Sequence, residues 1–347
     1  MIIEDAATIE AERLNDYLER VVPHFQEVRS LAPFAAGRSN PTFLLEAASG
    51  RYVLRTRPRS AVLSTAHQID REFRVLQALQ YTDVPVPKVL HLCSDDTVIG
   101  RPFYLMTFLE GRIEEDAALP RESPSQRSIM FEAAVDALAR LHSVDWAWLG
   151  LADYGRPAGY MPRQVKRWTT QFRSAQTQDY PNLERLIRWL EMNCPEGARG
   201  TIVHGDYRFG NLMFAPDAPH LRAVLDWELS TLGDPFCDLG YFCQVYYTSR
   251  RDEPLGGIRD VDRSALGIPE ISVLLDRYCA SSRQPLPVDW NAYLAFSFFR
   301  MAAITHGVYA RQAQRNGQST LSNIEALNIE NTAGLGLKIA LTAHNHS

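Results

Sequence analysis

The residues of this chain that could do chemistry are Asp206, Asn211 and Asp226, which lie in and just after the stretch IVHGDYRFGNLMF. Asn211 follows the first carboxylate by five residues, and Asp226 ends the apolar run AVLD. Phosphoryl transfer from a nucleotide requires a group that accepts the proton of the attacking hydroxyl and oxygen ligands that hold metal ions on the phosphates. The spacing predicts this chemistry, with Asp206 as the base and with Asn211 and Asp226 as ligands of Mg²⁺.

Short apolar runs surround these residues and have the composition of strands: 201–203, 212–214 and 222–225. The turn PDAP separates the last two, so they are expected to pair as a hairpin that returns Asp226 toward Asn211. A metal hydrolase with His204 and Asp206 as ligands is a competing interpretation, weakened because the sequence carries no His-rich partner motif. A short motif can also match by coincidence, and the flanking strands argue against that.

The composition is that of a soluble globular protein. With 347 residues, 46% hydrophobic and 22% charged, the chain can bury a large core and is long enough for two lobes. A net charge of −5 offers no basic surface, so no nucleic-acid partner is expected. The five cysteines form no Cys-x2-Cys pair, which indicates neither a disulfide framework nor a zinc site. The acidic start and the lack of an apolar run near ~18 residues predict a cytoplasmic protein without a membrane partner.

The motif segment resembles the aminoglycoside phosphotransferase and choline kinase group of protein-kinase-like enzymes. It is most similar to the kinase-like domain fused to some acyl-CoA dehydrogenases, because the chain carries VHGDYRFGNL and VLDWELSTLGDP. The resemblance runs from about residue 37 to beyond residue 247 and implies an α+β fold with two lobes. The N-terminal lobe, 1–108, would be an antiparallel sheet with a helix, and the C-terminal lobe, 109–347, mainly helical, with a hinge near 107–111.

The first hundred residues have the pattern expected of a nucleotide-binding lobe. Helical spacing over 8–22 precedes strand-like runs, which we expect over 28–34, 42–47 and 51–57. The resemblance implies that Gly37, Ser39 and Asn40, in the loop after the first strand, offer backbone N–H groups to the ATP phosphates. Without the downstream motifs, this single glycine would indicate only a turn.

Kinases carry a lysine on the third strand, where it contacts the α- and β-phosphates. This chain has no lysine before Lys88, and Arg55 stands at the matching position of the expected third strand. Arg55 is therefore the candidate phosphate clamp, with Arg57 as the alternative. The helix expected over 65–80 places Glu72 where it could pair with this clamp, with Asp70 as the alternative. Arginine is planar and forked, so its contact would differ from that of a lysine.

The apolar strand over 102–108 leads to the expected hinge. There the resemblance implies that backbone groups of Thr107 to Leu109 hydrogen-bond adenine, with Met106 and Phe108 packing around it. From the bare residues alone, these positions would be assigned to the core.

The second lobe is expected to contain long helices over 125–142, 290–315 and 321–343. The resemblance assigns Asp238, at the start of a further helix, and His204 to structural support of the catalytic loop. Arg208 could stabilise the transferred phosphate or form a salt bridge to Asp238 or Glu228, and Glu228 could contact a second metal through water.

These features predict an ATP-dependent kinase that uses Mg²⁺ and acts on a hydroxyl group of a small molecule, with a hydroxyacyl-type metabolite favoured by the resemblance. An aminoglycoside or choline-like substrate is the alternative. It would need clustered carboxylates, but arginines interleave with the acidic residues over 250–263 and cancel their field. An alternative of another class is a catalytically idle ATP-binding regulatory module, suggested by the arginine at position 55.

Overall fold

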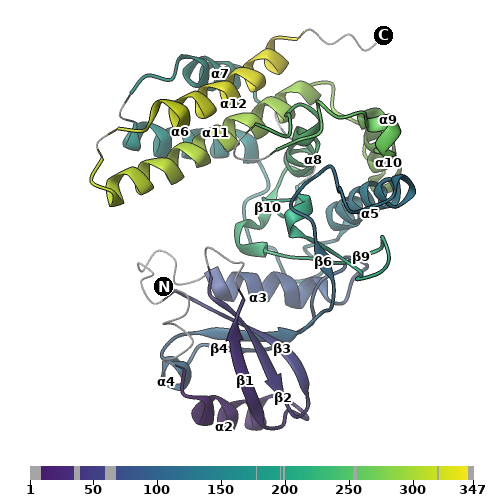
Figure 1. The fold of residues 1–347 in the computed structure, drawn as a ribbon, viewed down its shortest axis with the longest axis vertical. Helices are drawn as coiled ribbons and strands as arrows, with labels where there is room; N and C mark the ends of the chain where they lie inside the picture. Colours follow the sequence, from purple (N-terminus) through teal and green to yellow (C-terminus); the bar gives the residue numbers. More distant parts are fainter. Residues whose placement is uncertain are drawn as a thin grey trace. The chain divides into compact units, whose positions relative to one another are not determined.

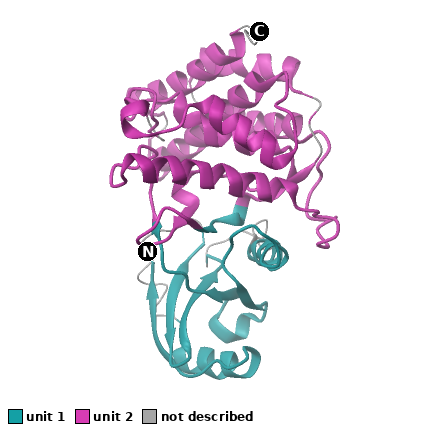
Figure 2. Ribbon diagram, turned by 90° about the vertical axis from the view of Figure 1, so that its right-hand side faces the viewer, with its two compact units in different colours: residues 1–112, 222–228 teal, residues 113–221, 229–347 magenta. Residues whose placement is uncertain are grey.

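The computed structural model describes residues 9–34, 40–58, 68–176, 178–195, 197, 200–252, 256–318 and 320–342. The chain forms two compact units, one of residues 1–112 with 222–228 and the other of residues 113–221 with 229–347 (Figure 2). The first boundary lies a few residues beyond the predicted one, and the prediction did not assign 222–228 to the N-terminal lobe. Val224 anchors this segment in the first unit, because its N–H donates to the Pro85 carbonyl at 2.8 Å.

A five-stranded antiparallel sheet of order β1-β2-β3-β5-β4 forms the centre of the first unit. Helices α2 and α3 lie on opposite faces of this sheet (Figure 1). The elements in chain order are α2 (Ala11–Val21), β1 (Val28–Pro33), β2 (Thr42–Ala47), β3 (Gly50–Thr56), α3 (Gln68–Leu79), β4 (Val89–Cys93), α4 (Asp96–Ile99) and β5 (Phe103–Thr107). Each predicted element is present, and the bounds that fall on described residues shift by three residues or fewer; the predicted start of α3 at residue 65 lies outside the described residues.

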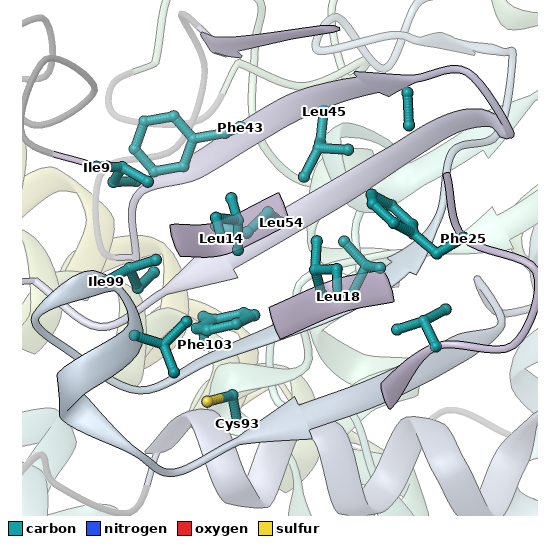
Figure 3. Packing of buried hydrophobic residues seen from close by; sticks show 14 residues of the cluster. Ile9, Leu14, Leu18, Phe25, Phe43, Leu45, Leu54, Cys93, Ile99 and Phe103 are labelled. Atoms are coloured by element: carbon teal, nitrogen blue, oxygen red, sulfur yellow. The ribbon is translucent and has the colours of Figure 1, made fainter. Parts of the chain in front are cut away.

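Side chains alternate along β3 and give its two faces different roles. Leu54 belongs to an apolar cluster that joins the sheet to α2, with Phe43, Phe103 and Leu18 among its members (Figure 3). Arg55 therefore points to the opposite face, which α3 covers. The packing of one face thus fixes the direction of the charged residue on the other.

The second unit is mainly helical. Its long helix α11 (Trp290–Arg315) packs against α6, α7, α8 and α12. The helices are α5 (Pro124–Ser143), α6 (Tyr160–Ala175), α7 (Pro181–Asn193), α8 (Pro235–Cys243), α9 (Arg263–Leu266), α10 (Ile271–Ser282), α11 and α12 (Asn323–Leu341) (Figure 1). Short 3-10 turns are η2 (Phe209–Asn211), η3 (Trp227–Leu229) and η4 (Gln244–Tyr246).

Short strands accompany these helices. They are β6 (Arg112–Ile113), β7 (Thr201–Val203), β8 (Leu212–Phe214), β9 (Leu221–Val224) and β10 (Thr231–Gly233). β7 pairs with β10, and a three-stranded sheet has the order β6-β8-β9, which confirms the predicted hairpin. Ala215 N–H donates to the His220 carbonyl at 3.0 Å and closes its turn.

The predicted long helices are present as α5, α11 and α12, and the bounds of α11 are those expected. Ile129 has the helical spacing of the buried apolar residues of α5, but its side chain is 47% exposed. Apolar spacing alone therefore did not fix every buried position of that helix. Within the described ranges, none of the helices combines the length and apolar character needed to cross a bilayer.

Candidate active site

The loop over 204–211 connects β7 to β8 and carries the predicted base. Its first two backbone N–H groups, of His204 and Gly205, donate to the two carboxylate oxygens of Asp238 at 2.6 and 2.9 Å. Gly205 has φ +84°, and a Cβ there would lie 2.7 Å from the Leu229 carbonyl oxygen, so no other residue fits without strain. One side chain of α8 thus fixes the entry of the loop.

Asp238 itself is buried and held in a polar network. His142 Nε2 lies 3.4 Å from its carboxylate, and the other nitrogen of that ring contacts the Tyr278 hydroxyl at 2.7 Å. Burial alone would raise the pKa of Asp238, but His142, His204 and the Gly205 N–H favour the carboxylate and hold the pKa below its usual value. The charged form is therefore the one that accepts the two N–H groups of the loop.

The Asp206 carboxylate is partly exposed and is oriented by its neighbours. Asn211 Nδ2 donates to both the backbone oxygen and the Oδ2 of Asp206, each at 2.8 Å. Because the amide nitrogen makes these contacts, the amide oxygen of Asn211 is the atom left to face a ligand. The Asp206 N–H is bound in turn, donating to His204 Nδ1 at 3.1 Å. His204 therefore supports the loop through its ring as well as its backbone.

Arg208 lies beside the Asp206 carboxylate, with Nε 3.6 Å from Oδ2. Its Nη1 pairs with Glu115 at 2.7 Å. Sequence reasoning named Asp238 or Glu228 as partners and missed Glu115, which precedes Arg208 by 93 residues without a motif around it. A guanidinium next to the predicted base can still contact an anionic group there.

In the first unit, Arg55 forms the centre of a buried charge cluster. Its Nε and Nη2 bind the two oxygens of Glu72 at 2.9 and 2.8 Å, and Nη2 also lies 3.0 Å from Asp226 Oδ1. Tyr104, whose hydroxyl is 3.5 Å from Glu72, completes the cluster and was not found from the sequence. The predicted pair of clamp and glutamate is thus present as a bidentate ion pair.

The Arg55 guanidinium stays charged in this setting. Burial would lower its pKa, but the carboxylates of Glu72 and Asp226 outweigh burial and raise it. Glu228 Oε2 lies 3.9 Å away and adds to the negative field. Glu72 is 1% exposed whereas Asp226 is 39% exposed, so Asp226 is the carboxylate of this cluster that can meet a ligand.

The predicted hinge residues are described at the end of β5. Thr107 N–H donates to the Lys88 carbonyl at 2.8 Å, and Phe108 N–H donates to the Arg51 carbonyl at 3.4 Å. The Arg51 guanidinium also stacks 4.5 Å from the centre of the Phe108 ring. The N–H groups of Thr107 and Phe108 are therefore already hydrogen-bonded within the unit. Among the predicted adenine contacts, the Leu109 N–H is not seen to bond another described residue.

The predicted phosphate loop is described only at its end. Gly37 and Ser39 lie outside the described residues. Asn40 is 2% exposed, its carbonyl accepts the Thr42 hydroxyl at 3.0 Å, and its Nδ2 has no hydrogen-bond partner among the described residues. A buried amide donor of this kind is costly unless a ligand or water satisfies it.

The predicted metal ligands are divided between the units, with Asn211 in the second and Asp226 and Glu228 in the first. Their amide and carboxylate oxygens are the donors that Mg²⁺ prefers. In the described part of the chain, no group of three or more His, Cys, Asp or Glu side chains could hold a metal ion by itself. The ligand set therefore remains a prediction.

Solved structures share the fold of this chain. A candidate aminoglycoside phosphotransferase of Ralstonia eutropha superposes with a TM-score of 0.85 at 39% identity, covering 95% of this chain and 98% of that one. Aminoglycoside phosphotransferase APH(2'')-Ib with bound ADP gives 0.59 at 14% identity, with 96% and 100% covered, which shows the fold alone. The class is a phosphotransferase of kinase-like α+β fold, and the predicted fold class is confirmed.

A model of the phosphotransferase enzyme family matches residues 30–269, and the chain belongs to this family. Acyl-CoA dehydrogenase family member 10 of Mus musculus is 43% identical over 334 residues, which are 93% of this chain and 31% of the relative. Family member 11 of Homo sapiens is 40% identical over 339 residues, 97% of this chain and 43% of the relative. The resemblance is confirmed, and the chain spans less than half the length of these curated relatives.

Replacing Asp238 with Asn should destabilise the second unit by about 2 kcal/mol, because an amide nitrogen cannot accept one of the two N–H groups. The folded-state pKa of Asp238 is lowered, so its contribution is fully present above the unfolded pKa of about 3.9 and is lost as pH falls through the folded value. We therefore expect the unfolding midpoint of D238N to lie below that of the parent protein by a constant amount from pH 7 down to about pH 4. The difference between the two midpoints should narrow as the pH falls further toward 3.

The control is Asp289→Asn, because Asp289 is exposed and makes no capping hydrogen bond at the start of α11. Its midpoint should equal that of the parent protein at every pH. Equal midpoints for D238N and D289N at neutral pH would contradict the bracing role.

Proposed function

We propose that this protein is an ATP-dependent kinase that transfers the γ-phosphoryl group of Mg-ATP to a hydroxyl group of a small molecule. The observation that carries the proposal is the fixed orientation of the Asp206 carboxylate. Asn211 donates to this carboxylate, and Asp238 holds the backbone of the loop that carries it. A partly exposed carboxylate held in one direction is what a general base for a substrate hydroxyl requires.

Each remaining side chain has a role in this proposal that its geometry supports. Arg55, held charged by Glu72, would contact phosphate oxygens through its remaining N–H groups. Arg208 lies next to Asp206 and would contact the transferred phosphoryl group once its guanidinium releases Glu115. Neither role requires a charge to be created, because both guanidinium groups are permanently protonated.

The residues also fit the metal and nucleotide. Mg²⁺ bound to ATP supplies neutralisation of charge on the phosphate oxygens. Asn211 and Asp226 would hold it through an amide and a carboxylate oxygen, with Glu228 as a contact through water. Asp226 is suited to this because it is the most exposed carboxylate of the Arg55 cluster.

The charges of the second unit favour a substrate that is not a polycation. Asp116 pairs with Arg250, Asp252 with Arg259, and Glu115 with Arg208. Carboxylates that are already paired with arginine attract a cationic ligand weakly. Together with the names of the relatives, which are acyl-CoA dehydrogenase family members, this supports a hydroxyacyl-type substrate over an aminoglycoside.

Replacing Asp206 with Asn should abolish turnover of Mg-ATP while leaving nucleotide binding intact, because the amide keeps the shape of the base but cannot accept the proton. Turnover is measured as ADP release with and without a hydroxyl library, and binding by calorimetry with ADP. The matched control is Asp217→Asn, on the turn after β8. Unchanged ADP release by D206N would refute the base assignment. The absence of turnover in the parent protein would favour the idle regulatory module.

Replacing Arg55 with Lys should raise the KM for Mg-ATP about tenfold, since lysine keeps the charge but loses the bidentate pairing and one charge-assisted contact. The control is Arg13→Lys on α2, where the side chain is 60% exposed. Steady-state kinetics with varied Mg-ATP separates the two variants. A KM for R55K equal to that of the parent would remove Arg55 from the nucleotide site.

Substrate class can be tested by direct competition between two sets of compounds. Purified protein with Mg-ATP should phosphorylate short hydroxyacyl thioesters, detected by the added mass of a phosphoryl group, and should leave kanamycin-type aminoglycosides unchanged. Cells that express the protein should show no protection against those antibiotics. Strong protection, or phosphorylated aminoglycoside in vitro, would replace the hydroxyacyl assignment with the aminoglycoside one.

A further inference from the structure

A charged side chain, that of Arg300, interrupts a buried stretch of the long helix α11. Arg300 lies in the middle of α11 and is 6% exposed, with apolar residues on both sides along the helix. A buried guanidinium destabilises a fold unless polar or aromatic groups surround it. The contacts of Arg300 therefore indicate why a charge is present at this position.

Arg300 reaches the backbone of the predicted base. Its Nη2 donates to the carbonyl oxygen of Gly205, which belongs to the peptide group that joins Gly205 to Asp206. The N–H of the same peptide group donates to His204 Nδ1 at 3.1 Å. The peptide plane directly before the Asp206 side chain is thus held from both edges, and only Arg300 comes from outside the loop.

The same guanidinium also lies against an aromatic ring. Its Cζ is 5.3 Å from the centre of the Tyr241 ring on α8. Tyr241 is 8% exposed, and the Asp206 carboxylate lies near enough to act on the pKa of its phenol. Burial raises the pKa of Tyr241 and the negative charge of Asp206 raises it further, so the phenol remains protonated and is available as a donor.

We propose that Tyr241 and Arg300 are positioning residues for Asp206: Arg300 fixes its backbone and the Tyr241 ring, and the Tyr241 hydroxyl fixes its carboxylate. This inference rests on the proposed role of Asp206 as the base. Asn211 already holds one carboxylate oxygen, so donation by the Tyr241 hydroxyl from a different helix would restrict rotation of the carboxylate. A base aimed in one direction lowers the barrier of proton transfer, whereas nucleotide binding does not depend on its aim.

Tyr241→Phe provides the first test, because it removes only the hydroxyl and keeps the ring against Arg300. Mg-ATP turnover, measured as ADP release, should show a kcat lowered about tenfold and a KM for ATP within about twofold of the parent. The matched control is Tyr246→Phe. Tyr246 is 7% exposed, and its hydroxyl donates to the Pro269 carbonyl at 2.7 Å rather than to the loop that carries Asp206.

The control separates positioning from stability. Both variants lose the hydroxyl of a buried tyrosine, so their unfolding temperatures should fall by similar amounts, while only Y241F should lose kcat. Arg300→Lys should retain most of the kcat because it keeps a charged donor for the Gly205 carbonyl, whereas Arg300→Met should lose it at least as strongly as Y241F. This rescue by the conservative residue would not follow from a packing role alone.

The outcomes distinguish this inference from the proposed function. If D206N abolishes turnover but Y241F has the same kcat as Y246F, the positioning role is wrong and the base assignment stands. If D206N retains turnover, the base assignment fails and the positioning role fails with it. A rise in the KM of Y241F with unchanged kcat would also overturn the inference, because it would place Tyr241 in nucleotide binding.

Discussion

The interaction on which the second unit depends is the acceptance of two successive backbone N–H groups by the Asp238 carboxylate. A loop without regular hydrogen bonding has no intrinsic reason to hold one conformation, so its donors need an acceptor that is itself fixed. Asp238 is fixed because it lies in the first turn of α8 and contacts His142. The buried carboxylate keeps its charge only because these donors surround it, so the loop and its support stabilise each other.

The first unit shows the same principle with ion pairs in place of backbone groups. Arg55 binds Glu72, which is almost fully buried, and Asp226, which is not. Removing either charge from the buried pair would leave the other unpaired at a high cost, so the pair is kept whole. This makes the replacement of lysine by arginine understandable: a forked guanidinium can hold the glutamate with two N–H groups and still reach another carboxylate. The arginine is thus compatible with an active enzyme.

The sequence predicted those parts of the site whose signals are local. Strands around 201–214, the hairpin before Asp226 and the pairing of Arg55 with Glu72 follow from short motifs and from side-chain alternation along β3. Glu115 and Tyr104 were missed because their contacts with Arg208 and Glu72 join segments far apart in sequence, and nothing in their neighbours marks them. In the sequence, Arg300 is only a charged residue within an apolar helix. Its contact could not be inferred from the sequence, because it depends on where the fold places the Gly205 carbonyl.

The way the base is held also bears on substrate choice. The loop that carries Asp206 receives support from α8 through Asp238 and from α11 through Arg300. The proposed base is therefore held by interior groups of the second unit, while Glu115, Asp116 and Asp252 of this unit are paired with arginines. Selectivity must then come from the shape and charge of surfaces outside this interior. If Asp206 is the base, such a division would let the same loop serve different hydroxyl substrates without a change in the groups that aim the carboxylate.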